Sequence, residues 1–220
     1  MAKLYVIDGT DGSGKQTQYE LLAKKLEEQG KKVLKITFPN YNKPSSSLVK
    51  MYLSGEFGKN ANDVNPYVAS TFYATDRFAT YKTEFEEFYQ KEDGIILADR
   101  YVSANMIHQA GKIEKNEEKD KFLEWVYDLE FNIYKIPKPD KVFFLNMPID
   151  FAMELIKSRE NKFTNQKEKD IHERDRNHLV NAYNAACYAS SKFNWEEIMC
   201  VKDEKLRTIE EIQEDIYSKM

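Results

Sequence analysis

The sequence predicts an α/β fold, a three-layer sandwich in which helices cover both faces of a five-stranded parallel sheet. Five short apolar runs lack the alternation of half-exposed strands and are typical of strands buried on both faces. Stretches with helical spacing separate these runs along the chain. The 220 residues, 41% of them hydrophobic, suffice for one core, so we expect a single domain over 1–220. The predicted strands are Leu4–Ile7, Val33–Phe38, Ile95–Ala98, Val142–Leu145 and Ile198–Val201.

Apolar residues three and four positions apart predict four helices between and after these strands. The first should stop at Gly30, because glycine readily takes the left-handed conformation that ends a helix. The third should end before Pro137, which disfavours helical backbone in the residue before it. The predicted helices run from about Leu21 to Gln29, Val68 to Phe88, Phe122 to Ile136 and Ile209 to Tyr217.

Composition excludes several classes of protein. The net charge is −4, from 33 basic and 37 acidic residues, whereas nucleic-acid-binding domains usually carry a strongly basic face. There is no run of about 18 apolar residues, so we expect no membrane span. A strand begins within a few residues of Met1, which leaves no room for a signal peptide. Cys187 and Cys200 lack metal-ligand spacing and are expected to be buried free thiols, which favours a cytoplasmic location.

A glycine-rich segment between the first strand and the first helix carries the strongest signal. Gly9-Thr10-Asp11-Gly12-Ser13-Gly14-Lys15 has Walker A spacing, with an apolar strand before it and an amphipathic helix after it. Its glycines let backbone N–H groups turn inward around an anion, and the helix N-terminus adds positive potential. Lys15 would reach the β- and γ-phosphates. The sequence therefore predicts a P-loop NTPase-type fold that binds ATP through residues 9–17.

The position after the lysine departs from the Walker pattern. It holds Gln16, followed by Thr17, where a Ser or Thr hydroxyl usually binds Mg²⁺. An amide is a poorer direct ligand, so we expect Mg²⁺ to be held mainly by phosphates and water. A carboxylate would complete its outer shell, and we expect Asp99 or Asp8 to supply it.

Further motifs follow the P-loop in order along the chain. Phe38-Pro39 comes after the second strand, Phe72-Tyr73-Ala74-Thr75-Asp76-Arg77 lies on the long helix, and Asp99-Arg100-Tyr101 follows the third strand. With the P-loop, these motifs make the chain similar to thymidylate kinases over nearly its whole length. The resemblance implies transfer of the γ-phosphate of ATP to dTMP, with Mg²⁺, giving dTDP and ADP. It also implies a cytoplasmic homodimer that associates through its long helices.

The resemblance assigns roles to residues on the acceptor side. Asp11 would repel a phosphate, so it matches the acid that contacts the acceptor sugar near its 3′-hydroxyl; the alternative is a solvent-facing turn residue. Arg100 lies where α/β sheets bind ligands and would clamp the acceptor phosphate, unless it merely pairs with Asp99 or a helix end. Tyr73 and Arg77 share a helix face, and would stack on thymine and bond its carbonyl edge. Tyr73 could instead be a core aromatic.

Five other positions complete the predicted acceptor site. Asn105 matches a position that contacts the base, since an amide suits the mixed donor and acceptor edge of thymine. His108 and Gln109 fall near the sugar and base, although His108 could be an ordinary surface histidine. Phe38-Pro39 resembles the apolar floor near the acceptor phosphate.

The segment Ser158–Arg176 is almost wholly polar and carries many charges of both signs. Such a run is usually a solvated loop, but its place between two helices also fits a mobile lid at about 158–170. Some thymidylate kinases carry a catalytic arginine in the P-loop, where this chain has Gly12 and Ser13. The resemblance then puts the catalytic cation in the lid, first at Arg159, whose guanidinium matches phosphate geometry. The other candidates are Lys162, Lys167, Lys169 and Arg174.

Two other functions stay open on the residues alone. One is a different nucleoside-monophosphate or deoxynucleoside kinase of the same fold, which the base pocket would distinguish. The other is a P-loop switch of the GTPase kind, which would need Asn-Lys-x-Asp after a late strand. After Val142–Leu145 the chain instead has Asn146-Met147-Pro148, which argues against a switch.

Overall fold

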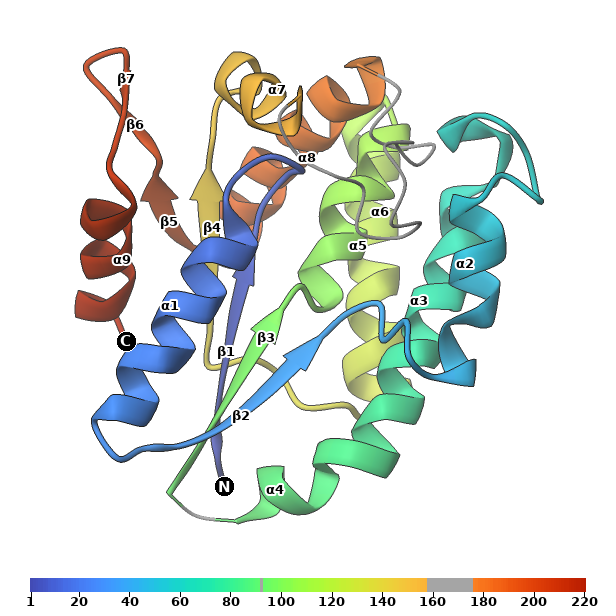
Figure 1. Cartoon of the computed structure of the whole chain (residues 1–220). Helices are drawn as coiled ribbons and strands as arrows, with labels where there is room; N and C mark the ends of the chain where they lie inside the picture. The colour runs from blue at the N-terminus through green and yellow to red at the C-terminus, as the bar shows by residue number, and fades with distance from the viewer. Residues whose placement is uncertain (92, 158–175) are drawn as a thin grey trace.

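A five-stranded sheet forms the centre of the protein (Figure 1). The structure, a computed structural model, describes residues 1–91, 93–157 and 176–220. The strand order is β2-β3-β1-β4-β5, and every neighbouring pair is parallel, which confirms the predicted fold class. The strands are β1 Lys3–Asp8, β2 Lys32–Thr37, β3 Gly94–Asp99, β4 Lys141–Asn146 and β5 Glu196–Met199.

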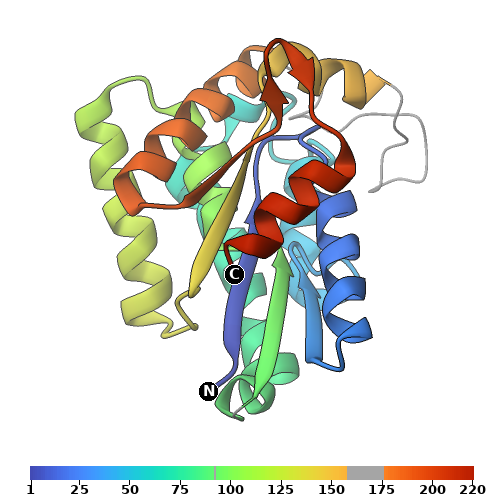
Figure 2. The same ribbon diagram turned by 90° about the vertical axis from the view of Figure 1, so that its left-hand side faces the viewer.

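Helices cover both faces of this sheet and make the outer two layers. Figures 1 and 2 show α1 and α9 on one face, with α3, α5, α6 and α8 on the other. The helices of the described residues are α1 Lys15–Glu28, α2 Ser47–Leu53, α3 Pro66–Thr80, α4 Glu86–Gln90, α5 Val102–His108, α6 Asn116–Tyr127, α7 Ile149–Lys157, α8 Arg176–Phe193 and α9 Ile209–Ser218.

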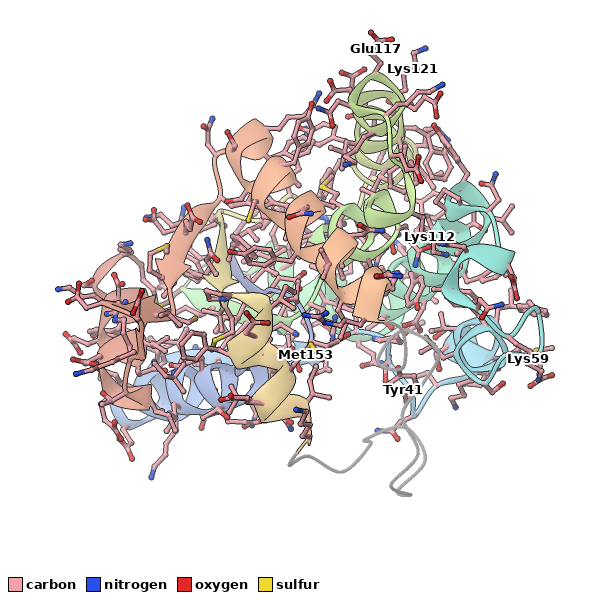
Figure 3. All side chains as sticks on the ribbon, turned by 90° about the horizontal axis from the view of Figure 1, so that it is seen from above. Tyr41, Lys59, Lys112, Glu117, Lys121 and Met153 are labelled. Carbon is pink, nitrogen blue, oxygen red and sulfur yellow. The ribbon has the colours of Figure 1, made fainter. Side chains whose placement is uncertain are left out.

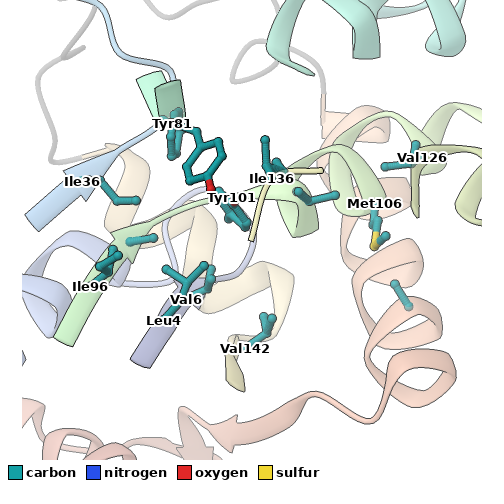
Figure 4. Packing of buried hydrophobic residues seen from close by; sticks show 14 of the residues in the cluster. Leu4, Val6, Ile36, Tyr81, Ile96, Tyr101, Met106, Val126, Ile136 and Val142 are labelled. Carbon is teal, nitrogen blue, oxygen red and sulfur yellow. The ribbon is translucent and has the colours of Figure 1, made fainter. Parts of the chain in front are cut away.

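Both faces of the central strands are buried, which explains the unbroken apolar runs. In β1, Leu4 and Val6 belong to the core under α5 and α6, part of which Figure 4 shows. Tyr5 and Ile7 point the other way and pack with α1 and α9. Alternate residues of one strand thus enter two different cores, so neither set can be polar.

The second strand differs from its prediction as a fully buried element. Of the six residues of β2, Ile36 alone is buried, and Lys32 and Lys35 are exposed. The strand lies at the edge of the sheet, where one side has no neighbouring strand. Exposed lysines at an edge discourage pairing with another sheet, so this departure has a physical reason.

The two long predicted helices are each interrupted by a π-helical turn. The first is α3 followed by a π segment at Tyr81–Phe85 and then α4. The second is α6 followed by a π segment at Asp128–Ile133, and Ile136 lies beyond that segment. Apolar spacing near 3.6 residues marks where a helix runs but does not reveal a local widening to i→i+5 hydrogen bonds.

The sequence also predicts two buried free thiols and no membrane span. Cys200 is buried and free, as expected, whereas Cys187 is free but only half-buried. Within the described residues, none of the helices combines the length and apolar character that crossing a bilayer requires.

Candidate functional site

The P-loop lies between β1 and α1, as its sequence predicted. Gly14 takes a left-handed conformation, with φ of +81°, immediately before α1 begins at Lys15. The backbone N–H of Gly9 donates to Asp8 Oδ1 at 2.8 Å, and Lys15 Nζ donates to the Thr10 carbonyl at 2.8 Å. The bond from Lys15 to Thr10 therefore spans the loop, and the bond from Gly9 fixes its start to Asp8 at the end of β1.

Gly12 is required by close packing of the loop against α7. A Cβ atom at this position would lie 2.3 Å from the Ala152 carbonyl oxygen, and the backbone φ of +81° also disfavours side chains. The loop thus has no room for an arginine at this position unless α7 moves. Close packing against α7 therefore explains why this position of the loop is a glycine.

A cavity of about 640 Å³ lies along the P-loop, a usual size for a small-molecule site. It is lined by residues of the P-loop, the first turns of α1, the segment after β3 and the inner face of α3. Gly9 and Thr10 are predicted to bind the nucleotide, but both are buried and neither lines the cavity. The predicted site residues that do line it are Asp11, Gly12, Ser13, Gly14, Lys15, Gln16, Thr17, Phe38, Pro39, Tyr73, Arg77, Asp99, Arg100, Asn105, His108 and Gln109.

Buried charges of both signs meet at one end of the cavity. Arg100 Nη2 donates to Asp11 Oδ1 in a close ion pair, and Lys15 Nζ lies 3.8 Å from the same oxygen. Burial raises the pKa of Asp11, but the charges of Arg100 and Lys15 and the hydrogen bond from Arg100 outweigh it and hold that pKa well below its usual value. Burial and the nearby Arg100 lower the pKa of Lys15 to about 8. This carboxylate therefore holds both cations near it, and is not a solvent-facing turn residue.

The backbone of Arg100 is in the left-handed region, with φ of +66°, which is unusual for a residue with a side chain. Such strain costs about 1–3 kcal/mol and collects at functional sites. Nη1 of Arg100 lies 2.9 Å from His108 Nε2. Because a guanidinium can only donate, this ring nitrogen accepts, and the proton of the neutral ring is on Nδ1.

His108 is a buried residue of the site, which excludes the alternative of a surface histidine. It is 8% exposed and stacks on His178 of α8, with ring centroids 6.0 Å apart and planes 19° apart. Burial is the main cause that lowers its pKa well below the usual value, and Arg100 and His178 add to it. The ring therefore stays neutral beside Arg100 at neutral pH.

Arg77 is held by a partner that sequence reasoning missed. Its Nε and Nη2 each donate to a carboxylate oxygen of Glu130 at 2.6 Å, and Nη1 donates to the Tyr101 carbonyl at 3.2 Å. Both members of this ion pair are almost completely buried. Contacts with the described residues thus use three of the five guanidinium N–H groups, on a side chain that lines the cavity.

The remaining predicted acceptor residues form one wall of the cavity. The half-buried ring of Tyr73 lines the cavity and also packs against the small core around Tyr52, which it meets edge-on with centroids 6.3 Å apart. Asn105 Nδ2 donates to the Ser70 carbonyl at 3.2 Å, which orients its amide. The buried Oε1 of Gln109 has no hydrogen-bond partner within the described part of the chain.

Asp99 and Asp8, the two candidates for a magnesium shell, differ in their surroundings. Asp8 is fully buried, and its carboxylate accepts from the Gly9 N–H and from Ser103 Oγ at 2.5 Å. Asp99 lines the cavity and accepts no hydrogen bond from the side chains that the structure describes. In the same ranges no group of three acidic, histidine or cysteine side chains could enclose a metal. The residues therefore fit an ion held by phosphates and water, with Asp99 beside it.

Sequence reasoning missed the other end of the cavity. Residues of a short hairpin, β6 Val201–Lys202 and β7 Lys205–Leu206, and of the start of α9 reach the cavity beside α1. Arg207 there donates to the Met199 carbonyl at 2.7 Å and to Asp215 at 2.9 Å. The Thr208–Glu211 capping box was a readable signal for the start of α9, but two-residue strands leave none.

The predicted lid and its candidate catalytic cations lie in a part of the chain that the structure does not describe. Positions 158–175 lie outside the described residues, and with them Arg159, Lys162, Lys167, Lys169 and Arg174. The structure does describe the elements on either side, α7 and α8. One of these, α7, is the helix against which Gly12 packs.

Comparison with known proteins gives one consistent result. The profile of a family described as thymidylate kinase matches residues 7–214. Thymidylate kinase from Mycobacterium tuberculosis (strain H37Rv) is 31% identical over 173 residues, which are 78% of each chain. A probable thymidylate kinase from Pyrobaculum aerophilum is 29% identical over 70% of this chain and 69% of its own. The solved structure of thymidylate kinase from Candida albicans has a similar fold, with a TM-score of 0.70 at 18% identity, covering 99% of this chain and 90% of that one.

The Arg77–Glu130 pair leads to a stability prediction. Replacing Glu130 with Gln leaves the buried guanidinium without a counter-ion, and we expect the free energy of unfolding to fall by about 3–5 kcal/mol. Urea denaturation followed by circular dichroism measures it. The control is Glu87→Gln, which removes an exposed partner of Lys91 and should leave unfolding unchanged. Equal effects of the two substitutions would contradict a special role for the buried pair.

Proposed function

The chain belongs to the thymidylate kinase family and is a nucleoside monophosphate kinase, and we propose that this cavity is where ATP phosphorylates dTMP to give dTDP and ADP. The single observation that carries this assignment is that the P-loop, with Asp11 in it, lines the same cavity as Arg100, Tyr73, Arg77 and Asn105. A phosphate donor and an acceptor nucleotide could thus meet end to end above the carboxyl edge of the sheet.

On the donor side, the P-loop would hold the phosphates of ATP. Lys15 is buried at the start of α1, where its ammonium and the helix N-terminus both favour an anion. Ser13 Oγ is buried and has no hydrogen-bond partner in the described ranges, so a phosphate oxygen would satisfy it. Gln16 and Thr17 are exposed at the cavity. The base of ATP would lie between α1 and the β6–β7 hairpin.

On the acceptor side, the incoming phosphate would compete with Asp11 for Arg100. A phosphate matches the guanidinium fork and carries more charge than a carboxylate, so Arg100 would turn to clamp it. Asp11, released from this pair, would accept a hydrogen bond from the 3′-hydroxyl of the sugar. His108 would accept from Arg100 in both arrangements.

The thymine would lie on the wall formed by α3 and α5. Tyr73 would stack on the ring, and an N–H of Arg77 not used by Glu130 or Tyr101 would donate to a base carbonyl. Asn105 and the unpartnered Oε1 of Gln109 would bond the remaining polar edge. Phe38 and Pro39 would form the apolar floor.

Catalysis would depend on positive charge around the transferred phosphoryl group, because charge there spreads over its equatorial oxygens. Lys15 and Arg100 supply two cations. The packing of Gly12 against α7 leaves no room for a third at that loop position. We assign the third to the segment after α7, first to Arg159 and then to Lys162 or Lys167, within a lid at about 158–170.

An acceptor panel tests the proposed function. We expect ADP to form with ATP and dTMP at a kcat/KM at least tenfold above that with dUMP, dCMP, UMP or AMP, because the base wall is built for thymine. A coupled assay for ADP measures all five, with Arg100→Ala as the inactive comparison. A preference for any other acceptor would replace the substrate but keep the reaction class.

Magnesium would lie beside Asp99 and neutralise the charge of the phosphates. Asp99→Asn removes that charge while keeping the shape of the side chain. We expect the Mg²⁺ concentration for half-maximal activity to rise roughly tenfold, as for other outer-shell partners of metals. Titration of Mg²⁺ at saturating ATP measures this, with calorimetry of MgADP binding as a second measurement. An unchanged Mg²⁺ requirement would remove Asp99 from the proposal.

We also propose that the protein is a cytoplasmic homodimer. Exposed apolar side chains cluster on α3 and after α6: Val68 is 49% exposed, Phe78 40% and Ile133 63%, and Phe78 packs on Tyr134 with centroids 5.3 Å apart. Light scattering after size exclusion should give about twice the chain mass for the wild type and a monomer for Phe78→Glu, because a charge cannot be buried there. A wild-type monomer would end the proposal.

A further inference from the structure

Lys112 is a half-buried lysine outside the cavity, and in the described part of the chain it pairs with no carboxylate. It ends a 3₁₀ turn, Ala110–Lys112, that follows α5. Its ammonium donates to Tyr52 Oη at 2.7 Å and to the Val64 carbonyl at 3.2 Å, and lies 5.0 Å from the centre of the Tyr52 ring. Figure 3 shows it where the green ribbon that carries it meets the teal ribbon of α3.

The groups that Lys112 bonds belong to a small separate core. Val49, Tyr52, Leu53, Val64 and Ala69 pack together apart from the two large cores of the sheet. We call residues 47–64, which carry α2 and the turn after it, the α2 segment. Tyr52 Oη also lies 3.4 Å from the Ala61 carbonyl, to which it donates. One ammonium therefore ties α2, through Tyr52, and the last residue of the α2 segment, Val64, to the 3₁₀ turn that follows α5.

This core continues directly into the proposed acceptor site. The Tyr52 ring meets Tyr73 edge-on, at 88° between planes, and Tyr73 lines the cavity. Leu53, the next residue, lines the cavity as well. A shift of the α2 segment would therefore move Leu53 and change the support that Tyr52 gives to Tyr73, while the donor side is built from other elements.

From these contacts we propose that Lys112 is a positioning residue for the acceptor nucleotide, which acts by pinning the α2 segment so that Tyr52 and Leu53 hold the acceptor wall in place. The inference rests on the proposed function of the cavity. A charge-assisted hydrogen bond is about twice as strong as a neutral one, and the contact with the ring also needs the charge. The protonated ammonium is therefore the form that pins the segment.

The charge of Lys112 responds to pH near neutrality. Burial lowers the pKa of Lys112 to about 7, and no charged side chain among residues 1–91, 93–157 and 176–220 opposes it. The titratable group that faces it from α2 is the Tyr52 phenol, and from the turn before α3 it meets the Val64 carbonyl. Asp63 of that turn bonds Asn60 instead. A lysine with a lowered pKa loses its charge as pH rises through that value, so the bonds from Lys112 to the α2 segment weaken above pH 7.

Substitution at Lys112 separates acceptor binding from donor binding. Lys112→Met keeps the length of the stem and removes the donors, and we expect KM for dTMP to rise about tenfold, with KM for ATP and kcat within twofold. The control is Lys115→Met, an exposed lysine three residues on, which should leave all three constants unchanged. Equal changes in both KM values, or no change, would overturn the inference. Thermal denaturation checks that each variant is folded.

Two further measurements exclude a merely structural role. Between pH 7 and 9, where the dTMP phosphate is already dianionic, KM for dTMP should rise severalfold in the wild type and less in Lys112→Arg, which stays charged. Identical pH profiles would overturn the inference. In a double-mutant cycle, the effects of Lys112→Met and Tyr52→Phe on KM for dTMP should be less than additive, because both substitutions remove the bond from Lys112 to Tyr52 Oη; full additivity would contradict the inference. Absence of dTMP phosphorylation by the wild type would instead refute the proposed function.

Discussion

The ion pair between Asp11 and Arg100 is the interaction around which the site is organised. Asp11 belongs to the loop after β1, and Arg100 follows β3, the strand that pairs with β1 along its length. Parallel pairing brings the carboxyl ends of both strands to the same edge, and the ion pair then joins the two segments that leave them. The strained backbone of Arg100 is maintained by this arrangement, because its N–H donates to Ile7 of β1 and its side chain reaches Asp11.

Charge compensation explains how so many ionisable groups can be buried at one place. Lys15 and Arg100 are cations, and Asp8, Asp11 and Asp99 surround them, so no single charge is isolated in a medium of low dielectric constant. In the binding that we propose, a nucleotide phosphate would enter the site by exchange, since it would take over cations that carboxylates already hold. Electrostatic preorganisation of this kind is the principal means by which proteins stabilise phosphoryl transfer.

Buried contacts hold in place the residues around the ion pair of Asp11 and Arg100. Ser103 holds Asp8, Glu130 holds Arg77, and Gly12 lets the loop lie directly against α7. The acceptor wall has a different support, because the α2 segment packs in its own small core and meets the rest of the protein through few polar contacts. We therefore expect the proposed donor and acceptor sides to respond separately to substitution and to pH.

The sequence by itself determined the fold class, the P-loop, the family and most of the residues that line the cavity. These signals are local: apolar runs mark buried strands, and the spacing Gly9 to Lys15 marks an anion site whatever surrounds it. Only the tertiary structure decided which residues contact one another in the site. Glu130 lies 53 residues from Arg77, and Arg207 and Ile209 reach the cavity from the far end of the chain. No local pattern encodes such contacts, because they follow from how the sheet places distant segments side by side. The edge position of β2 and the π turns were hidden for the same reason, since packing against neighbours sets them and residue spacing does not.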